Sequence, residues 1–153
     1  MGDIMDINLL NLEDSKKELL KLREENLISK GKLSAYQIFV HCAKTIEYSM
    51  IGYPKIKSKF IQHTAGKLMI HKFLKKGYMR HNLEVDVLGS SLIEDNGTTD
   101  EGIEILLETI RKFLTYKGRL QPHFFFGELT KEEYDKYFSI HIANHLSGLI
   151  KGE

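Results

Sequence analysis

The sequence predicts an all-α protein, an up-and-down four-helix bundle with one additional N-terminal helix. Three observations favour this class. Apolar residues recur at spacings of three and four in five segments, the connections between most of these segments are short, and the alternation typical of strands is almost absent. A chain of 153 residues has the size of one ordinary domain, so we expect a single domain over residues 1–153.

The first two helices are expected over residues 12–26 and 35–52. In the first, leucines are interspersed with many charges, as in a half-exposed amphipathic helix. Ser34 can cap the second helix, and Gly52 and Pro54 end it. The apolar stripe of the second helix consists of Tyr36, Phe39, Ala43, Ile46 and Met50.

A third helix is expected from Ile56 to Lys76, with Gly77 in the position of a C-terminal cap. Lysines in its last turn suit the negative end of the helix dipole. The spacing predicts that its buried face is formed by Phe60, Ile61, Ala65, Leu68, Met69 and Phe73.

The last two helices have clear N-terminal signals. Thr98 or Thr99 opens the fourth helix, acidic residues follow in its first turns, and Gly118 closes it. Thr130 followed by Glu133 is a capping box for the fifth helix, which is expected over residues 131–150.

The connection between the third and fourth helices, Tyr78 to Gly97, is longer than a compact bundle needs to turn a corner. A lid over a binding site is one interpretation. A small strand in Leu83 to Leu88, or a loop that follows the surface, is equally consistent with the residues.

The charge balance, the apolar runs and the cysteine count limit which partners and sites are expected. The 22 basic and 21 acidic residues leave a formal charge of +1, which argues against nucleic acid or a membrane surface and favours a small-molecule substrate. No apolar run could span a bilayer and no secretory signal is visible, so we expect a cytoplasmic protein, monomeric or homodimeric. Cys42 is the only cysteine, which excludes an internal disulfide and a thiolate cluster.

Two histidines near the end of the chain, His141 and His145, are the most informative polar residues. They lie about 40° apart around the fifth helix and therefore share one face. That face is apolar, so both imidazoles should point inward, where they need a metal ion or hydrogen-bond partners. From the spacing alone, hydrogen bonds to the protein are the simpler interpretation.

A metal site would need a third ligand from another helix. The available residues are His41, His63, His71, His81 and His123. Periodicity does not single out His41, because it lies off the apolar stripe of its helix, on the side of Gln37, Thr45 and Tyr48.

A family resemblance does single out His41. The stretches "QIFVHCAKTIEYSMIGYP", "KGYMRHNL" and "QPHFFFGELTKEEYDKYFSIHIANHL" are similar to the markers of a DinB-like subgroup of unassigned function. The DinB-like superfamily includes YfiT-like metal-dependent hydrolases and transferases of bacterial low-molecular-weight thiols. The resemblance implies a four-helix bundle in which three histidines hold a divalent ion, here His41, His141 and His145.

The other histidines have different expected roles. His123, in the loop that leads into the fifth helix, is a candidate to support a metal ligand through a hydrogen bond. His63, His71 and His81 match no family role and are expected on the surface or in packing. Relatives often carry a further histidine early in the last helix, and "YDKYFSIH" lacks it, so an additional base there is in doubt.

The expected chemistry is that of a zinc, nickel or iron ion with an open position. Such an ion lowers the pKa of bound water toward roughly 7 or stabilises a thiolate, which suits a hydrolase or a thiol S-transferase with a small-molecule, thiol-type substrate. No serine-hydrolase, phosphate-loop or H-E-x-x-H motif offers another catalytic apparatus. The alternative is a non-catalytic binding or stress-related bundle with a structural or vestigial metal site.

Overall fold

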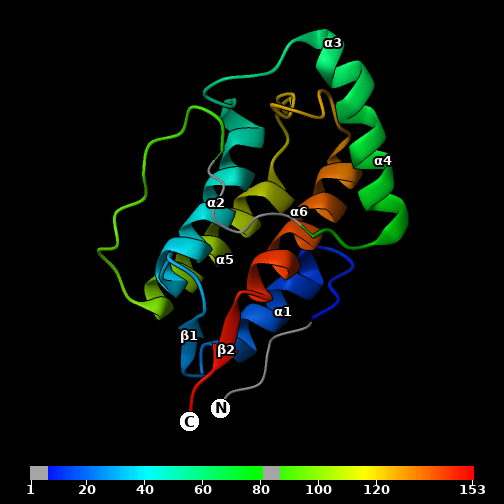
Figure 1. The fold of residues 1–153 in the computed structure, drawn as a ribbon. Helices are drawn as coiled ribbons and strands as arrows, with labels where there is room; N and C mark the ends of the chain where they lie inside the picture. Colours follow the sequence, from blue (N-terminus) through cyan, green and yellow to red (C-terminus); the bar gives the residue numbers. More distant parts are fainter. Residues whose placement is uncertain (1–6, 81–86) are drawn as a thin grey trace.

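The computed structural model describes residues 7–80 and 87–153, and this part of the chain is mostly helical with a small two-stranded sheet (Figure 1). The predominance of helix agrees with the sequence prediction, and the sheet was not predicted. The elements in chain order are α1 (Leu12–Leu22), β1 (Leu27–Ser29), α2 (Ala35–Ile51), α3 (Lys59–Ile61), the π-helix η1 (Gln62–Gly66), α4 (Lys67–Lys76), α5 (Thr99–Thr115), α6 (Lys131–Leu146) and β2 (Leu149–Lys151).

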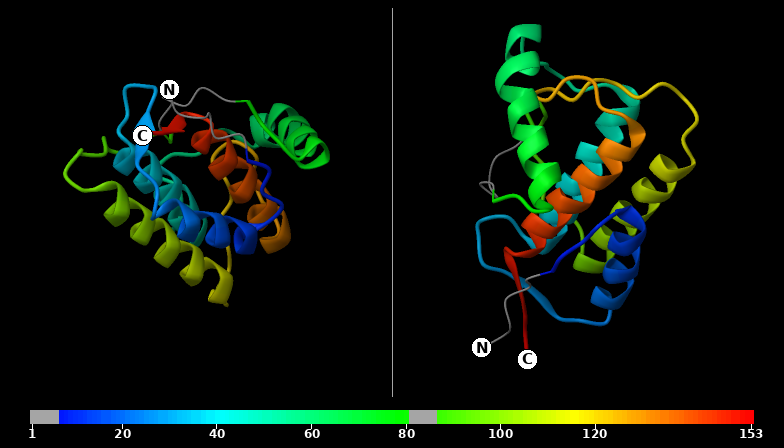
Figure 2. Two further views of the ribbon diagram at one scale, coloured as in Figure 1. Left: turned by 90° about the horizontal axis from the view of Figure 1, so that it is seen from below. Right: turned by 90° about the vertical axis from the view of Figure 1, so that its right-hand side faces the viewer.

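Helix α6 runs through the middle of the molecule (Figures 1 and 2). It contacts α1, α2 and α4, and α4 flanks it on the side away from α2. Helix α2 packs along α5, which also contacts α1. The core between these helices is rich in aromatic rings: Phe113 of α5 meets Tyr134 and Phe138 of α6 edge to face, and all three side chains are fully buried.

Capping boxes begin α2, α5 and α6. The sequence predicted a cap at Ser34, a cap at Thr98 or Thr99, and a capping box at Thr130. The hydroxyls of Ser34, Thr98 and Thr130 each accept a hydrogen bond from the backbone N–H three residues further on. The two threonine caps are continued by acidic residues in the first turn, where the helix dipole favours negative charge. Local sequence therefore determines where the helices of the core start.

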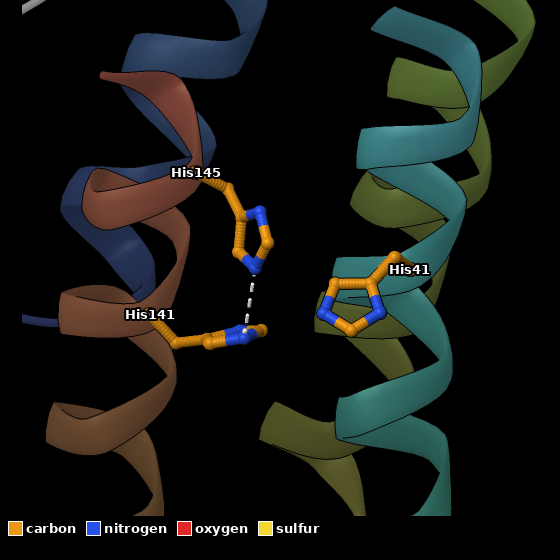
Figure 3. A group of neighbouring side chains, drawn as sticks. All are labelled: His41, His141 and His145. Carbon is orange, nitrogen blue, oxygen red and sulfur yellow. Dashed lines mark hydrogen bonds between the residues drawn. The ribbon is translucent and has the colours of Figure 1, made fainter. Parts of the chain in front are cut away.

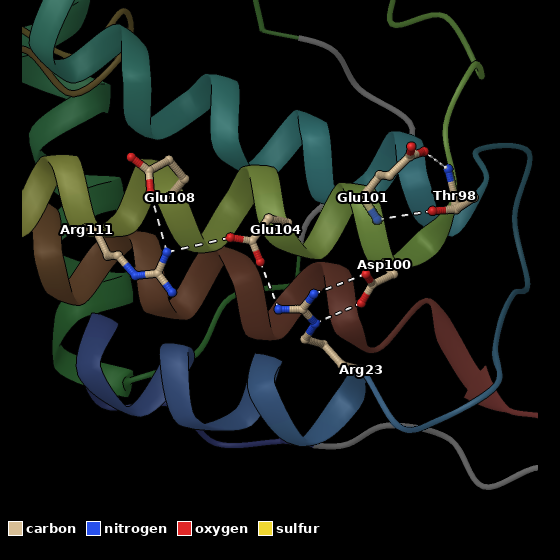
Figure 4. A network of polar contacts seen from close by, with 7 residues as sticks. All are labelled: Arg23, Thr98, Asp100, Glu101, Glu104, Glu108 and Arg111. Carbon is tan, nitrogen blue, oxygen red and sulfur yellow. Dashed lines mark hydrogen bonds and ion pairs between the residues drawn. The ribbon is translucent and has the colours of Figure 1, made fainter.

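An ion-pair network joins the end of α1 to the first turns of α5 (Figure 4). The Arg23 guanidinium donates through Nε to Asp100 at 2.7 Å and through Nη1 to Glu104 at 2.8 Å. Arg111 continues the network along α5 to Glu104 and Glu108. The pairs are exposed to solvent, so they orient the two helices more than they stabilise them.

The expected third helix differs most from the prediction. It begins at Lys59 rather than Ile56, and the π-helix interrupts it. The inward positions are Gln62, Gly66 and Ile70, whereas Phe60 and Leu68, predicted to be buried, are 77% and 74% exposed.

The remaining residues of the predicted face are also displaced: Ala65 and Met69 are exposed, and Ile61 and Phe73 are only partly buried. The physical cause is a close backbone approach at Gly66, where a Cβ would lie 2.0 Å from the carbonyl oxygen of Phe125. Because only glycine fits, the face containing Gly66 turns inward and the large apolar residues turn out.

The first and the last helix of the chain are both shorter than predicted. The first helix ends at Leu22, not at Asn26, and the last ends at Leu146, not at Ile150. The chain segments that follow, β1 and β2, pair antiparallel with Ile28 opposite Ile150. Leu149 is still fully buried, so the apolar residue keeps its predicted environment in a strand instead of a helix.

The long connection before α5 is described at residues 78–80 and 87–97. Its second part lies against the start of α2, where Gln37 Nε2 donates to the carbonyl of Ile93 at 2.8 Å and Ser34 Oγ donates to Asp95 at 2.7 Å. The strand considered for Leu83 to Leu88 falls mainly on residues 81–86, which lie outside the described residues, and the lid interpretation stays a prediction.

Candidate metal centre

Three histidine side chains from two helices meet in the interior (Figure 3). His41 comes from α2, and His141 and His145 lie one turn apart on α6. Their side chains are buried, and one ring nitrogen from each residue lies within 4.8 Å of the others. The His41 ring centroid is 5.3 Å from that of His141 and 4.6 Å from that of His145.

The burial of α2 explains why His41 faces the pair although it lies off the apolar stripe. Phe39 and Ile46 on the stripe are buried, and so are His41 and Thr45 on another side of the helix. Because α2 packs against both α5 and α6, it is buried on two sides. Only one of those sides is apolar enough to appear in the periodicity.

The donor set fits a divalent metal ion. Tetrahedral coordination with metal–nitrogen bonds of about 2.0–2.1 Å separates two ligand nitrogens by about 3.3 Å. The Nε2 atoms of His141 and His145 are 3.1 Å apart, close to that spacing. Three imidazoles with no carboxylate or thiolate suit zinc, nickel or iron rather than magnesium or calcium.

A cavity of about 310 Å³ opens beside the histidines. His41 and His141 line it, and His145 does not. Most of the remaining lining is apolar, formed by Met69, Phe73, Met79, Val87 and the phenylalanines at 124–126. Among the described residues that line this cavity, none carries a carboxylate, an ammonium or a guanidinium group.

Tyr137 connects the histidine cluster to a fourth buried histidine, His123. The Tyr137 ring stacks on His141 at a centroid distance of 5.9 Å and meets His123 edge to face at 5.3 Å. All three residues line the cavity. Burial raises the pKa of the Tyr137 hydroxyl, so this ring stays neutral.

His123 begins a tight loop that is closed by its backbone hydrogen bonds with Gly127, whose φ of 75° favours glycine. Its Nδ1 accepts hydrogen bonds from the backbone N–H groups of Phe125 and Phe126 at 3.1 and 3.2 Å. Burial, helped by the positive charge of Lys67, lowers the pKa of His123 to about 3. The ring is therefore neutral, and its proton sits on Nε2.

The structure places the other residues considered in the sequence as follows. His63 and His71 are exposed, as expected, and His81 lies outside the described residues. Cys42 is buried in the core, where burial raises the pKa of its thiol, so it is a packing residue. Within residues 7–80 and 87–153, His41, His141 and His145 are the group of side chains that could hold a metal ion.

Sequence reasoning missed three residues of the cavity. Tyr137 precedes His141 by four residues, so helical spacing could have placed it on the same face. Met79 and Val87 belong to the long connection, where no periodicity indicates which side chains turn inward.

Comparison with known proteins gives a family and no activity. A family model described as "Protein of unknown function (DUF1569)" matches residues 1–152. No curated protein matches the chain, and no solved structure does. In the part of the chain that the structure describes, no helix is long and apolar enough to cross a membrane.

Proposed function

The chain belongs to the DUF1569 family of proteins of unknown function, and we propose that it is a metal-dependent enzyme in which His41, His141 and His145 bind one divalent ion. The reaction we propose is hydrolysis of a small molecule or transfer of a low-molecular-weight thiol. The proposal includes a DinB-like four-helix bundle formed by α2, the helical segment from α3 to α4, α5 and α6, with α1 as the additional helix.

The observation that carries the proposal is the position of the histidines at the wall of a cavity. Structural metal sites are closed by four protein ligands, whereas catalytic sites have three protein ligands and an open position. Here three buried imidazoles converge, and two of them also line an apolar cavity of about 310 Å³. A bound ion would therefore be accessible to a small molecule that enters the cavity.

Neighbouring parts of the chain bury and orient the three imidazoles. The three imidazoles lie buried between α2 and α6, where each can offer a ring nitrogen to an ion. Tyr137 packs against His141 and restricts the plane of its ring. When bound, a divalent ion with three neutral ligands supplies a Lewis acid for an oxygen or sulfur atom of the substrate.

The second candidate is a non-catalytic protein whose histidines form a polar network or a structural site. One observation favours it: Nε2 of His141 and Nε2 of His145 are 3.1 Å apart and can share a hydrogen bond without an ion. In that arrangement the Nε2 atom of one ring donates and the Nε2 atom of the other accepts.

Metal analysis of untagged protein purified without added metal separates a metal site from a polar network that holds no ion. We expect about one ion per chain in the wild type and almost none in the double variant His141→Ala, His145→Ala. The matched control is His63→Ala, His71→Ala, which removes two exposed histidines and should retain the ion. Equal metal content in the wild type and the first double variant would remove the proposal.

A thermal melt with and without chelator adds the distinction between a catalytic and a structural ion. A structural ion contributes directly to folding stability, so its removal lowers the melting temperature strongly. A catalytic ion can be lost at modest cost to stability. Loss of turnover with little change in melting is the result we expect.

A further inference from the structure

We infer that the cavity binds an uncharged, largely apolar small molecule that carries a hydrogen-bond acceptor such as a carbonyl oxygen, and that His123 Nε2–H donates to this acceptor. His123 is then a specificity-determining residue that contacts the ligand, whereas His41, His141 and His145 contact the ion. The inference deepens the proposed function and rests on it to the extent that the ligand is a substrate. It names the class of molecule that the site takes.

The first support is the orphaned donor of His123. The side chain is 1% exposed, and Nε2 is buried without a hydrogen-bond partner among the described residues. The ring proton is on Nε2 and not on Nδ1, because Nδ1 already accepts hydrogen bonds from two backbone N–H groups. A buried donor left unsatisfied in a native structure calls for an explanation, and His123 lines the cavity.

The second support is the chemistry of the cavity wall. Its polar groups among the described residues are few: besides the histidines, they are Thr45 and Tyr137. The Thr45 hydroxyl already donates to the backbone carbonyl of His41 at 2.7 Å. In the ion-free protein, a charged ligand would lose its hydration without gaining an opposite charge from the described residues of the wall, so these residues disfavour carboxylates and ammonium groups.

The third support is the common position of the two polar ends. His123 and the metal-site residues His41 and His141 line the same cavity, and Tyr137 packs between His123 and His141. One molecule can therefore meet His123 with its acceptor and the histidine cluster with another group. The volume of about 310 Å³ lies at the small end of the range for ligand pockets, roughly 300–1,000 Å³.

Three matched probes test the inference: benzophenone, which is neutral and has a carbonyl; diphenylmethane, which lacks the oxygen; and 4-benzoylbenzoate, which adds a carboxylate. The full-length protein is titrated with each by calorimetry, as purified and again after dialysis against chelator. The chelated sample excludes binding of a probe to an ion. It also keeps this test separate from the proposed function, because absence of a metal site would leave the order of affinities unchanged.

In the chelated protein we expect the ketone to bind about tenfold more tightly than the hydrocarbon, as one additional hydrogen bond allows, and the carboxylate to bind weakest. Equal affinity of ketone and hydrocarbon would overturn the role of His123. A carboxylate that binds the chelated protein as tightly as the ketone would overturn the ligand class, and so would no binding of any probe.

The variant His123→Asn removes the Nε2 donor and keeps an acceptor near Nδ1 for the N–H groups of Phe125 and Phe126. It should lower the affinity for benzophenone to that for diphenylmethane, and the exposed control His71→Asn should change neither. If His123→Asn does not fold, the carbonyl stretching band of benzophenone bound to the chelated wild type decides. A band at the frequency found in a hydrocarbon solvent would contradict the hydrogen bond.

Discussion

Substitution of Gly66 by alanine is the sharpest test of how the segment from α3 to α4 packs on the molecule. The backbone of Gly66 has φ −62° and ψ −48°, ordinary helical values that alanine adopts without strain. Helix propensity alone therefore predicts that Gly66→Ala stabilises the protein by about 0.5–1 kcal/mol. The tertiary contacts predict the opposite sign.

A Cβ at position 66 would lie 2.0 Å from the carbonyl oxygen of Phe125 and 3.2 Å from Cα of Phe126, where ordinary contact begins at 3.4 Å. Both neighbours are backbone atoms, so no side chain can rotate away and the helix must move by about 1.4 Å, the difference between 3.4 and 2.0 Å. Overpacking of this kind costs about 1–3 kcal/mol. With the propensity gain subtracted from the upper end, we expect a net destabilisation of about 2 kcal/mol.

Urea denaturation followed by circular dichroism measures the change. The control Ala65→Gly alters an exposed neighbour in the same helical segment and should cost only the propensity difference, about 0.5–1 kcal/mol. Because the phenylalanines at 125 and 126 also line the cavity, Gly66→Ala should weaken benzophenone binding as well. An unchanged or increased unfolding free energy for Gly66→Ala would refute the close packing of this helix on the 123–127 loop.

Three further predictions concern His123, Thr130 and Tyr134. The pKa of His123 falls from its ordinary value of 6.5 to about 3 on folding, so the unfolded chain binds the additional proton between these values. Stability is unaffected above pH 6.5 and is lost as the pH falls toward 3, by about 2 kcal/mol at pH 5, from 1.5 pH units at about 1.36 kcal/mol each. The urea midpoint of His123→Asn should fall less between pH 7.5 and 5 than that of the wild type, and equal slopes would count against this linkage. Thr130→Ala removes the cap of α6 and should cost about 1 kcal/mol in the same assay, whereas Thr130→Ser should retain most of it. Tyr134→Phe deletes a hydroxyl that donates to the Gln121 carbonyl at 2.6 Å; it should cost about 1–2 kcal/mol with unchanged metal content, and a loss of the ion would show that the side chain acts on the site.

The sequence predicted the starts of the helices well, because these depend on interactions between residues that are close in the chain. A capping residue and its partner lie three positions apart, so Ser34, Thr98 and Thr130 could be read without knowledge of the fold. The ends of α1 and α6 could not, because they depend on pairing between β1 and β2, which are more than 100 residues apart in the chain. Strands of three residues leave too short a pattern to recognise.

Periodicity was misleading where a backbone contact decides which face turns inward. The large apolar residues at 60 and 68 predicted one buried face, and Gly66 reversed it through a single close approach. A glycine in a helix signals either a weak point or a contact, and the sequence alone does not distinguish them.

For the histidine cluster, the sequence predicted part of the arrangement and could not predict the rest. The spacing of His141 and His145 indicated a shared inward face, which the structure has. The wheel of α2 could not indicate His41, since that helix is buried on two sides, and only the family resemblance pointed to it. His123 was expected only as a support for a metal ligand. Its buried environment could not be predicted, because the 123–127 loop creates it by folding back on itself.

The central claim is that His41, His141 and His145 hold one ion at the wall of the cavity. The most direct measurement is an anomalous difference map from a crystal of protein loaded with zinc, recorded above and below the zinc absorption edge. We expect a single strong peak per chain, about 2.0–2.1 Å from one ring nitrogen of each of the three residues. Absence of a peak between these rings, or a peak held by other side chains, would contradict it.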